Sequence, residues 1–464
     1  MLRPVNQVAR PVVLALVLLP LVLPFFGCSR GPRDERPNVL LISIDTLRPD
    51  HLSSYGGARP SPAMDAMAAR GVRFENAFSP SPWTLPAHAS MLSGRYPGSI
   101  SDDPNSLDLF RKTRLLSSVL SDRGYKTAAV TGGLYVGSKF GLAEQFDFFD
   151  DSNATSNVAV AQEWLRRNAR QPFFLFFHTY FVHAPYNDRR YVQGRSGHRL
   201  QDIYKDGKLN RAHFAVCCEG VETTAAERAF VEALYDGGVA VVDSYVKQLW
   251  ETLGTLDLQK KTVVIITSDH GEEFWEHTGR GAYHGHTLYD ELIRIPLIWV
   301  DPKISEKGRV VTEPVNLIDI VPTLLARLGM KHSEPVDGVD LQPLLATGAW
   351  GIDRVLFAEG SRNGPERKSV RSDGTKLIVT PYPTVQGGEG SRYPVPVLAP
   401  VELYLSGDEA ERHNVAKQRS EQVEALMKRL APRIERMPEG HKAASLEGLD
   451  EQIREQLRAL GYAE

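Results

Sequence analysis

The chain has 464 residues, a formal net charge of −3, and 42% hydrophobic and 24% charged residues. This length allows one large α/β domain with an appended subdomain, or two domains that share a core. Because positive and negative charges nearly balance, the composition indicates neither a nucleic-acid partner nor an acidic solvating tail.

The first 28 residues have the pattern of a signal peptide. Arg3 and Arg10 supply positive charge, residues 11–26 are apolar but interrupted by prolines, and Cys28 follows a small residue. This pattern resembles a bacterial lipoprotein signal, which predicts membrane attachment through a lipidated Cys28 and an extracytoplasmic place in the cell envelope. A plainly cleaved signal, which would give a secreted protein, and an uncleaved anchor are the alternatives. Residues 29–36 are polar and are expected to form a tether.

Apolar runs of strand length alternate with helix-compatible stretches from residue 37 to about residue 350. The predicted strands are 38–45, 127–131, 173–178, 262–268 and 295–300, and the predicted helices include 61–70, 158–167 and 225–253. This alternation predicts an α/β domain over 37–350, with helices on both faces of a central sheet. The polar stretch 187–222, which holds the adjacent Cys217 and Cys218, is expected to be an irregular insertion.

The last part of the chain has a different pattern. Shorter candidate strands lie within 367–380 and at 402–405, and a helix-compatible stretch follows at 420–434. We therefore expect a small α+β subdomain over 351–436 and a charged helical tail over 437–464.

Two polar motifs end predicted strands. Asp45 closes the first strand, and Asp269-His270 follows the strand at 262–268. Open α/β sheets bind ligands at the carboxyl ends of their strands, and an Asp-His pair offers one oxygen and one nitrogen ligand. These residues, together with the hydroxyl of Thr84, predict a metal site.

Thr84 lies in the stretch 83–95, directly before Pro86 and a helix-compatible run. This position places its hydroxyl at a helix N-terminus, which favours anions. A bound metal would lower the pKa of the hydroxyl and polarise a phosphoryl or sulfuryl oxygen, so Thr84 is the candidate nucleophile. His88, one turn later, would either contact the nucleophile or pack in the core.

The order and spacing of these motifs resemble the sulfatase family of the alkaline phosphatase superfamily, over nearly the whole chain after the signal. The matching segments are 37–45, 83–95, 173–186, 268–271, 286–297 and 402–414. The resemblance implies an alkaline-phosphatase-like sandwich, in which helices cover both faces of a large central mixed sheet, with a small C-terminal α+β subdomain. It also implies a divalent metal and a small-molecule, lipid or glycan ester as substrate.

Key positions depart from the sulfatase pattern. Thr84 stands where the family has the Cys that is oxidised to formylglycine, and His88 stands where it has an Arg, so no formylglycine is expected. The pair Asp269-His270 replaces an all-oxygen pair, and an imidazole ligand favours Zn or Mn over Ca or Mg. The Gly-Lys-x-His element that contacts sulfate in the family is missing from 131–135.

Three further histidines are site candidates through the resemblance. His183 matches the family's His-x-Pro segment, which contacts the ester or, in two-metal relatives, a second ion. His284 and His286 lie where the family has a Lys near the leaving group, so either would protonate the leaving oxygen or bind a second metal. His286 is preferred because it aligns closest to the Thr-Leu-Tyr element.

The sequence thus predicts a metal-dependent hydrolase of phosphate or sulfate esters that uses Thr84 as nucleophile. The alternatives are a sulfatase proper that works without formylglycine, a lipid-headgroup or glycan phosphotransferase, and a non-catalytic binder of sulfated glycans. Arg48 would either bind the anionic ester or pair with Asp50, and His178 and His277 are expected to be structural or solvated.

Overall fold

The computed structural model describes residues 35–153, 157–194, 222–277, 281–304, 306–331, 334–351, 353–381 and 398–436. The predicted signal peptide with Cys28, most of the tether, the Cys217-Cys218 pair and the predicted tail at 437–464 lie outside the described residues. Among the described residues, no helix combines the length and apolar character needed to cross a bilayer.

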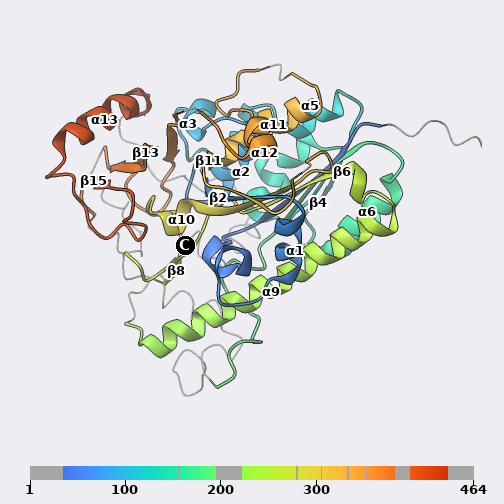
Figure 1. The fold of residues 1–464 in the computed structure, drawn as a ribbon, viewed down its shortest axis with the longest axis horizontal. Helices are drawn as coiled ribbons and strands as arrows, with labels where there is room; N and C mark the ends of the chain where they lie inside the picture. Colours follow the sequence, from blue (N-terminus) through green and yellow to red (C-terminus); the bar gives the residue numbers. More distant parts are fainter. Residues whose placement is uncertain are drawn as a thin grey trace, which may run out of the picture. The chain divides into compact units, whose positions relative to one another are not determined.

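A nine-stranded sheet forms the centre of the described chain (Figure 1). Its strands are β1 (Asn38–Ile44), β2 (Val72–Phe78), β3 (Lys126–Val130), β4 (Phe148–Asp150), β5 (Phe173–Thr179), β6 (Thr262–Thr267), β9 (Arg294–Val300), β10 (Arg309–Val311) and β11 (Val315–Asn316). The order is β10-β2-β9-β6-β1-β5-β3-β4, with β11 paired to β2. Strand β9 is antiparallel to β2 and β6, whereas β1 is parallel to both of its neighbours, so the sheet is mixed.

Helices cover both faces of this sheet. Figure 1 shows α1 (Pro62–Arg70), α6 (Val158–Asn168) and α9 (Ala225–Thr255) on one side, and α2 (Thr84–Ser93), α5 (Leu116–Ser121), α11 (Ile320–Arg327) and α12 (Gln342–Thr347) on the other. Successive residues of β1 alternate between two buried clusters, with Leu41 in the cluster under α2 and Leu40 in the one over α9. Two covered faces explain why β1 is apolar at nearly every position.

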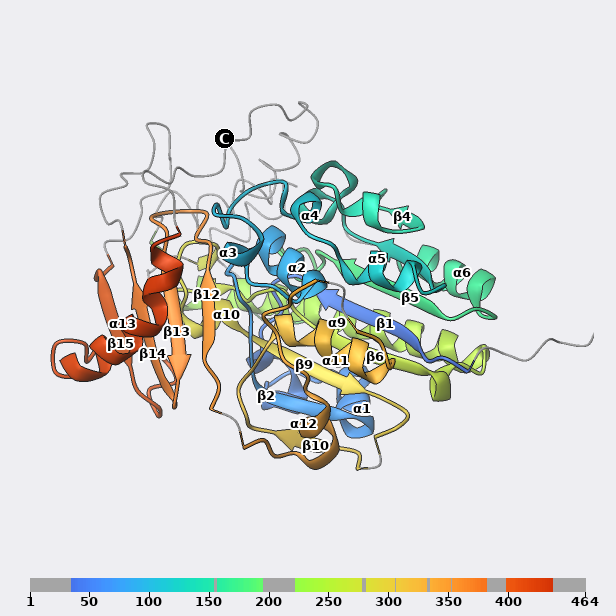
Figure 2. The same ribbon diagram turned by 90° about the horizontal axis from the view of Figure 1, so that it is seen from above.

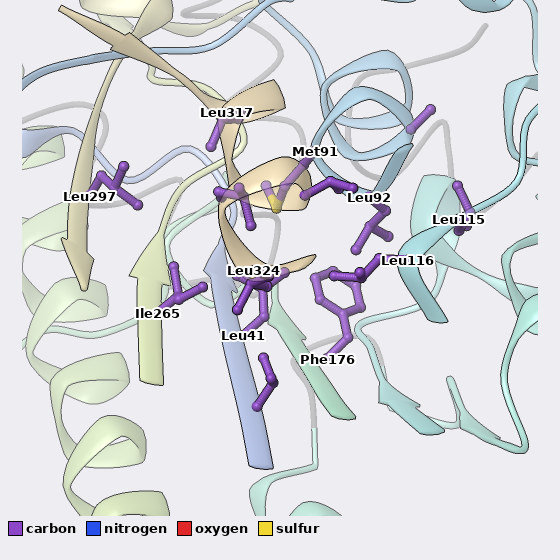
Figure 3. Packing of buried hydrophobic residues seen from close by; sticks show 14 of the residues in the cluster. Leu41, Met91, Leu92, Leu115, Leu116, Phe176, Ile265, Leu297, Leu317 and Leu324 are labelled. Carbon is purple, nitrogen blue, oxygen red and sulfur yellow. The ribbon is translucent and has the colours of Figure 1, made fainter. Parts of the chain in front are cut away.

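The core on the α2 side holds the helix that begins at Thr84. Figure 3 shows Leu41, Phe176 and Ile265, from the neighbouring strands β1, β5 and β6, on the same side as Leu92 of α2 and Leu324 of α11. All five side chains are fully buried. This packing fixes the position of α2 relative to the sheet.

Shorter elements complete the main unit. They are α3 (Pro97–Ile100), α4 (Leu109–Lys112), α10 (Asp290–Ile293), β7 (Glu273–Phe274), β8 (Gly281–Tyr283), and 3-10 turns at Pro49–His51, Ser53–Tyr55, Leu134–Val136, Ser138–Phe140, Leu142–Gln145, Gln259–Lys261 and Leu317–Asp319.

A second, antiparallel sheet follows in the C-terminal part (Figure 2). Its order is β12 (Leu356–Glu359), β13 (Lys368–Ser372), β14 (Thr375–Val379) and β15 (Val401–Tyr404), and α13 (Ser420–Ile434) packs on it. A buried cluster that includes Phe78 of β2, Leu292 of α10 and Ile378 of β14 joins this sheet to the main unit. The second sheet therefore packs against the main unit.

The structure confirms the predicted fold class and refines several elements. The candidate stretch 367–380 is a hairpin, β13 and β14, which turns at Asp373-Gly374, where both residues have positive φ (47° and 68°). An Asp-Gly pair is the favoured sequence for such a two-residue turn. Strands β2 and β12 and the short strands β4, β7, β8, β10 and β11 were not predicted.

Candidate active site

The ends of β1 and β6 bring the predicted ligands together. The two strands are adjacent and parallel, and Ser43 pairs with Thr267. Asp45 lies two residues after Ser43, and Asp269 lies two residues after Thr267, so the two carboxylates leave the sheet at the same level. Ligand atoms of Asp45, Asp269 and His270 lie within 4.8 Å of one another, and all three side chains are fully buried. The arrangement is the one expected for a ligand site at the carboxyl edge of a sheet.

The chemistry of this cluster fits a divalent cation. Oδ1 of Asp45 and Oδ2 of Asp269 are buried and accept no hydrogen bond from the residues that the structure describes. His270 donates Nδ1–H to Gly271 O at 2.8 Å, which leaves the Nε2 lone pair 3.4 Å from Asp269 Oδ2 and 3.9 Å from Asp45 Oδ1. Two carboxylate oxygens and one imidazole nitrogen that face one another form a suitable ligand set.

The pKa values of Asp45 and Asp269 are shifted because the two carboxylates are buried close to each other. Burial raises the pKa of Asp45 well above its usual value, and the charge of Asp269 raises it further. Although burial alone would also raise the pKa of Asp269, the neighbouring His270 and His88 hold it below its usual value. Two carboxylates in a dry site repel one another, and a cation between them would remove that repulsion.

Thr84 is the first residue of α2 and is fully buried at the edge of this cluster. Its Oγ1 lies 3.4 Å from His270 Nε2, and its hydroxyl is one of the groups that lower the pKa of Asp45. The N-terminus of α2, which carries the positive end of the helix dipole, faces the same region. The hydroxyl therefore lies between the ligand cluster and a helix N-terminus.

His88 supports the turn that carries Thr84. Its Nδ1–H donates to the Thr84 carbonyl at 2.8 Å, and its Nε2 lies 2.9 Å from Ser43 Oγ. Burial lowers the pKa of His88, which favours the neutral ring. Because both ring nitrogens have partners, His88 contacts the backbone of Thr84 and not its hydroxyl.

His284 packs against His270, and His183 packs against His284. The ring of His284 is 4.5 Å from the ring of His270 and 4.9 Å from that of His183. Nδ1 of His284 is 2.8 Å from Glu272 Oε1, and Glu272 Oε2 accepts the Tyr186 hydroxyl at 2.8 Å. Burial, followed by the charge of His284, lowers the pKa of His183 to about 3.

His286 has a different environment. Its Nε2 lies 2.6 Å from Glu273 Oε2, and its ring packs 5.0 Å from that of Tyr283. The structure thus brings His284, rather than the preferred His286, against His270. The sequence analysis did not select Glu272 or Glu273, although both directly follow the Asp269-His270-Gly271 motif.

His178, which the sequence analysis expected to be structural or solvated, lies against the ligand cluster. It is fully buried, and its Nε2 lies 3.3 Å from Asp45 Oδ2, so it holds the oxygen of Asp45 that does not face His270. The pairing of His178 with Ser43 in adjacent strands explains this contact, and a histidine at the end of an otherwise apolar strand was the available signal. His277, in contrast, stacks on Tyr289 and binds Glu291 away from the ligand cluster.

Arg48 is engaged in ion pairs. It contacts Asp50 at 2.8 Å and Glu276 at 2.6 Å, and it donates to the Glu272 carbonyl at 2.9 Å. Of the two roles considered for Arg48, the structure supports the pairing with Asp50.

Comparison with known proteins identifies the family of this fold and site. A sequence model described as "Sulfatase" matches residues 37–330. The chain belongs to the sulfatase family. As a member of this branch of the alkaline phosphatase superfamily, it is a sulfatase-like ester hydrolase.

Curated sulfatases match the chain at moderate identity. Human arylsulfatase K is 25% identical over 383 residues, which cover 72% of this chain and 70% of that protein. The ulvan-active sulfatase of Formosa agariphila is 25% identical over 376 residues, which cover 72% and 71%.

Solved structures share the fold. The phosphonate monoester hydrolase of Agrobacterium radiobacter has a TM-score of 0.63 and 21% identity, over 86% of this chain and 95% of that one. A protein solved in complex with its substrate D-glucosamine-2-N,6-O-disulfate has a TM-score of 0.65 and 17% identity, over 86% and 98%.

Proposed function

We propose that this sulfatase-family protein hydrolyses phosphate esters with Thr84 as its nucleophile and with a divalent metal held by Asp45, Asp269 and His270. The observation that carries the proposal is the Thr84 hydroxyl, which lies 3.4 Å from His270 Nε2 at the N-terminus of α2. The imidazole of His270 favours Zn or Mn over Ca or Mg. Such an ion would lower the pKa of the hydroxyl and polarise an ester oxygen.

The chain's own residues provide the remaining functions. In the first step Thr84 Oγ1 would form a bond to phosphorus, the bond from phosphorus to the leaving oxygen would break, and the hydroxyl proton would pass to the Asp45 carboxylate, whose pKa is raised by burial. The positive end of α2 would stabilise the charge on the phosphoryl oxygens. His284, whose Nδ1 contacts Glu272, and the neighbouring His183 would contact the ester oxygens.

A threonine nucleophile favours phosphoryl over sulfuryl transfer. A phospho-threonine intermediate can be cleaved by a second in-line attack by water, which returns the hydroxyl of Thr84 and releases phosphate. Formylglycine sulfatases instead release sulfate by elimination from a hydrated aldehyde, and Thr84 cannot form that group. Transfer to a glycan or lipid hydroxyl in place of water is the phosphotransferase alternative, and binding of a sulfated glycan without turnover is the non-catalytic one.

Sulfate esters are the second candidate substrates, since the curated relatives are sulfatases. The ulvan-active relative and the neighbour solved with D-glucosamine-2-N,6-O-disulfate support a glycan ester as substrate. We also propose that the enzyme acts in the cell envelope, attached through a lipidated Cys28. Loss of labelled palmitate incorporation in Cys28→Ser would support this attachment, and incorporation of no label into the wild type would contradict it.

Initial rates of the metal-loaded protein on aryl phosphate monoester, aryl phosphodiester and aryl sulfate test the proposed function. We expect Thr84→Ala to abolish turnover of a preferred phosphate ester and Thr84→Ser to retain part of it. Ser90→Ala is the matched control, because Ser90 lies in the same helix and its buried Oγ has no hydrogen-bond partner among the described residues. Dominant Thr84-dependent sulfate release would support the sulfatase alternative, and turnover that survives Thr84→Ala would overturn the proposed nucleophile.

A further inference from the structure

The turn that carries Asp45 holds a strained residue. Thr46 follows Asp45 at the end of β1 and has a φ of 58°, in the left-handed region. A β-branched side chain rarely adopts this conformation, and such strain persists only where the surrounding contacts hold it. Because Thr46 is fully buried directly beside a candidate metal ligand, the contacts that hold Thr46 also bear on the position of the Asp45 carboxylate.

The segment after β6 holds one part of this turn. Thr46 N–H donates to Asp269 Oδ1 at 3.3 Å, and Leu47 N–H donates to Ser268 Oγ at 2.9 Å. These two bonds tie the turn to the segment that carries the other candidate ligands. The Thr46 carbonyl and the Arg48 N–H are held from another part of the chain.

Tyr235 of α9 binds both of these groups. Its hydroxyl donates to the Thr46 carbonyl at 2.7 Å and accepts the Arg48 N–H at 2.8 Å. A single oxygen atom thus connects the two ends of the turn from Thr46 to Arg48. Since α9 and α2 cover opposite faces of the sheet, Tyr235 holds the Asp45 turn from one face and Thr84 approaches from the other (Figure 1).

The ring of Tyr235 is fixed by its neighbours. The side chain is fully buried, and its ring centre lies 5.0 Å from that of Phe274 and 5.6 Å from that of Tyr186. Both pairs are edge-to-face, which is a preferred arrangement of aromatic rings. A phenylalanine at this position would keep these ring contacts and lose only the hydroxyl, so Tyr235→Phe isolates the effect of the hydroxyl on the Asp45 turn.

We propose that Tyr235 is a positioning residue that acts through Thr46 on the metal ligand Asp45. Its hydroxyl holds the strained turn, and the turn keeps Asp45 Oδ1 directed toward His270 Nε2, at 3.9 Å. Without the hydroxyl, two buried backbone groups would lose this partner, and the turn would relax away from the ligand geometry. This inference rests on the metal site of the proposed function, but it depends neither on the nucleophile nor on the kind of ester.

Metal binding by the full chain tests this proposal without turnover. After removal of metal with a chelator, isothermal titration calorimetry with Zn²⁺ gives the dissociation constants of the wild type and of Tyr235→Phe. We expect Tyr235→Phe to weaken Zn²⁺ binding by between about tenfold and a hundredfold, as for other residues that orient metal ligands. At saturating Zn²⁺, its kcat for a phosphate ester should fall more than its KM rises, because the change affects the metal ligand and not the contacts to the ester.

Tyr55→Phe is the matched control. The Tyr55 hydroxyl also donates to a carbonyl and accepts an amide N–H, both of Leu297, at 3.1 Å and 2.9 Å. Because Leu297 lies within β9 and carries no candidate ligand, Tyr55→Phe should lower the melting temperature but leave the Zn²⁺ affinity and kcat unchanged.

A second variant tests the role of Thr46. Glycine adopts the left-handed conformation without the cost that threonine has, so Thr46→Gly combined with Tyr235→Phe should restore part of the Zn²⁺ affinity that Tyr235→Phe loses. No recovery in the folded double variant would contradict the proposed action through Thr46.

The outcomes separate this proposal from the proposed function. Equal Zn²⁺ affinity of the wild type and of a folded Tyr235→Phe would overturn the inference, even if hydrolysis depends on Thr84. Weaker Zn²⁺ binding by Tyr235→Phe, in a protein that shows no Thr84-dependent hydrolysis, would support the inference while contradicting the proposed function. A wild type that binds no Zn²⁺ would contradict both.

Discussion

Gly271 connects the candidate ligand His270 to the rest of the fold, and its substitution by alanine gives a sharp test of the site geometry. A Cβ at this position would lie 2.0 Å from the carbonyl oxygen of Glu291 and 3.0 Å from its carbonyl carbon. Because Cβ atoms do not occur within 3.0 Å of such atoms, either α10 or the His270 segment must move by about 1 Å. Gly271 O also accepts Nδ1–H of His270 at 2.8 Å, so the displacement would reach the imidazole directly.

We expect Gly271→Ala to lower the free energy of unfolding by about 1–3 kcal/mol, as for other overpacked sites. A displacement of about 1 Å at a catalytic group can reduce the rate by roughly a hundredfold, so kcat/KM should fall by more than the stability loss alone explains. Urea denaturation and initial rates at saturating metal would measure the two effects. Gly351→Ala is the control, since its Cβ would have no atom within 4 Å. Equal stability and activity of Gly271→Ala and the wild type would refute the close contact.

Three further predictions address pH, His88 and the metal. The pKa of Glu359 falls from 4.5 to about 2 because, despite burial, Lys368 and Arg433 stabilise its charge, so this carboxylate contributes about 3 kcal/mol of stability above pH 4.5 that is lost as the pH falls toward 2. In Glu359→Gln the free energy of unfolding should fall less between pH 4.5 and pH 2 than it does in the wild type. The same fall in both proteins would contradict this prediction. His88→Ala should lower the free energy of unfolding by about 1–3 kcal/mol, because it leaves Ser43 Oγ and the Thr84 carbonyl without their partner. It should also lower kcat more than it raises KM. A kcat equal to that of the wild type would exclude a role of His88 in positioning Thr84. Chelation should abolish ester hydrolysis and lower the melting temperature, with recovery on addition of Zn or Mn and with a much smaller shift in Asp269→Asn. Full activity after exhaustive dialysis against chelator, with no metal found by elemental analysis, would contradict a metal site.

The local sequence was sufficient to predict most elements of the central sheet and the residues at its carboxyl edge. Strand β1 is apolar because both of its faces are covered, and this pattern is visible without a structure. Asp45 and Asp269-His270 were found because they end such runs. The strand β2 was missed because its exposed and buried positions are irregular and it pairs antiparallel with β9 across a register shift.

What the sequence by itself determined is therefore the fold class, the family and the residue types of the ligand cluster, since each depends on patterns within short segments. Only the tertiary structure decided which of the two nearby histidines, His284 or His286, lies against His270, and that His178 holds Asp45. Side-chain orientation depends on strand register and on packing between segments such as those of Thr84 and His270, which are 186 residues apart, and no local pattern encodes such contacts.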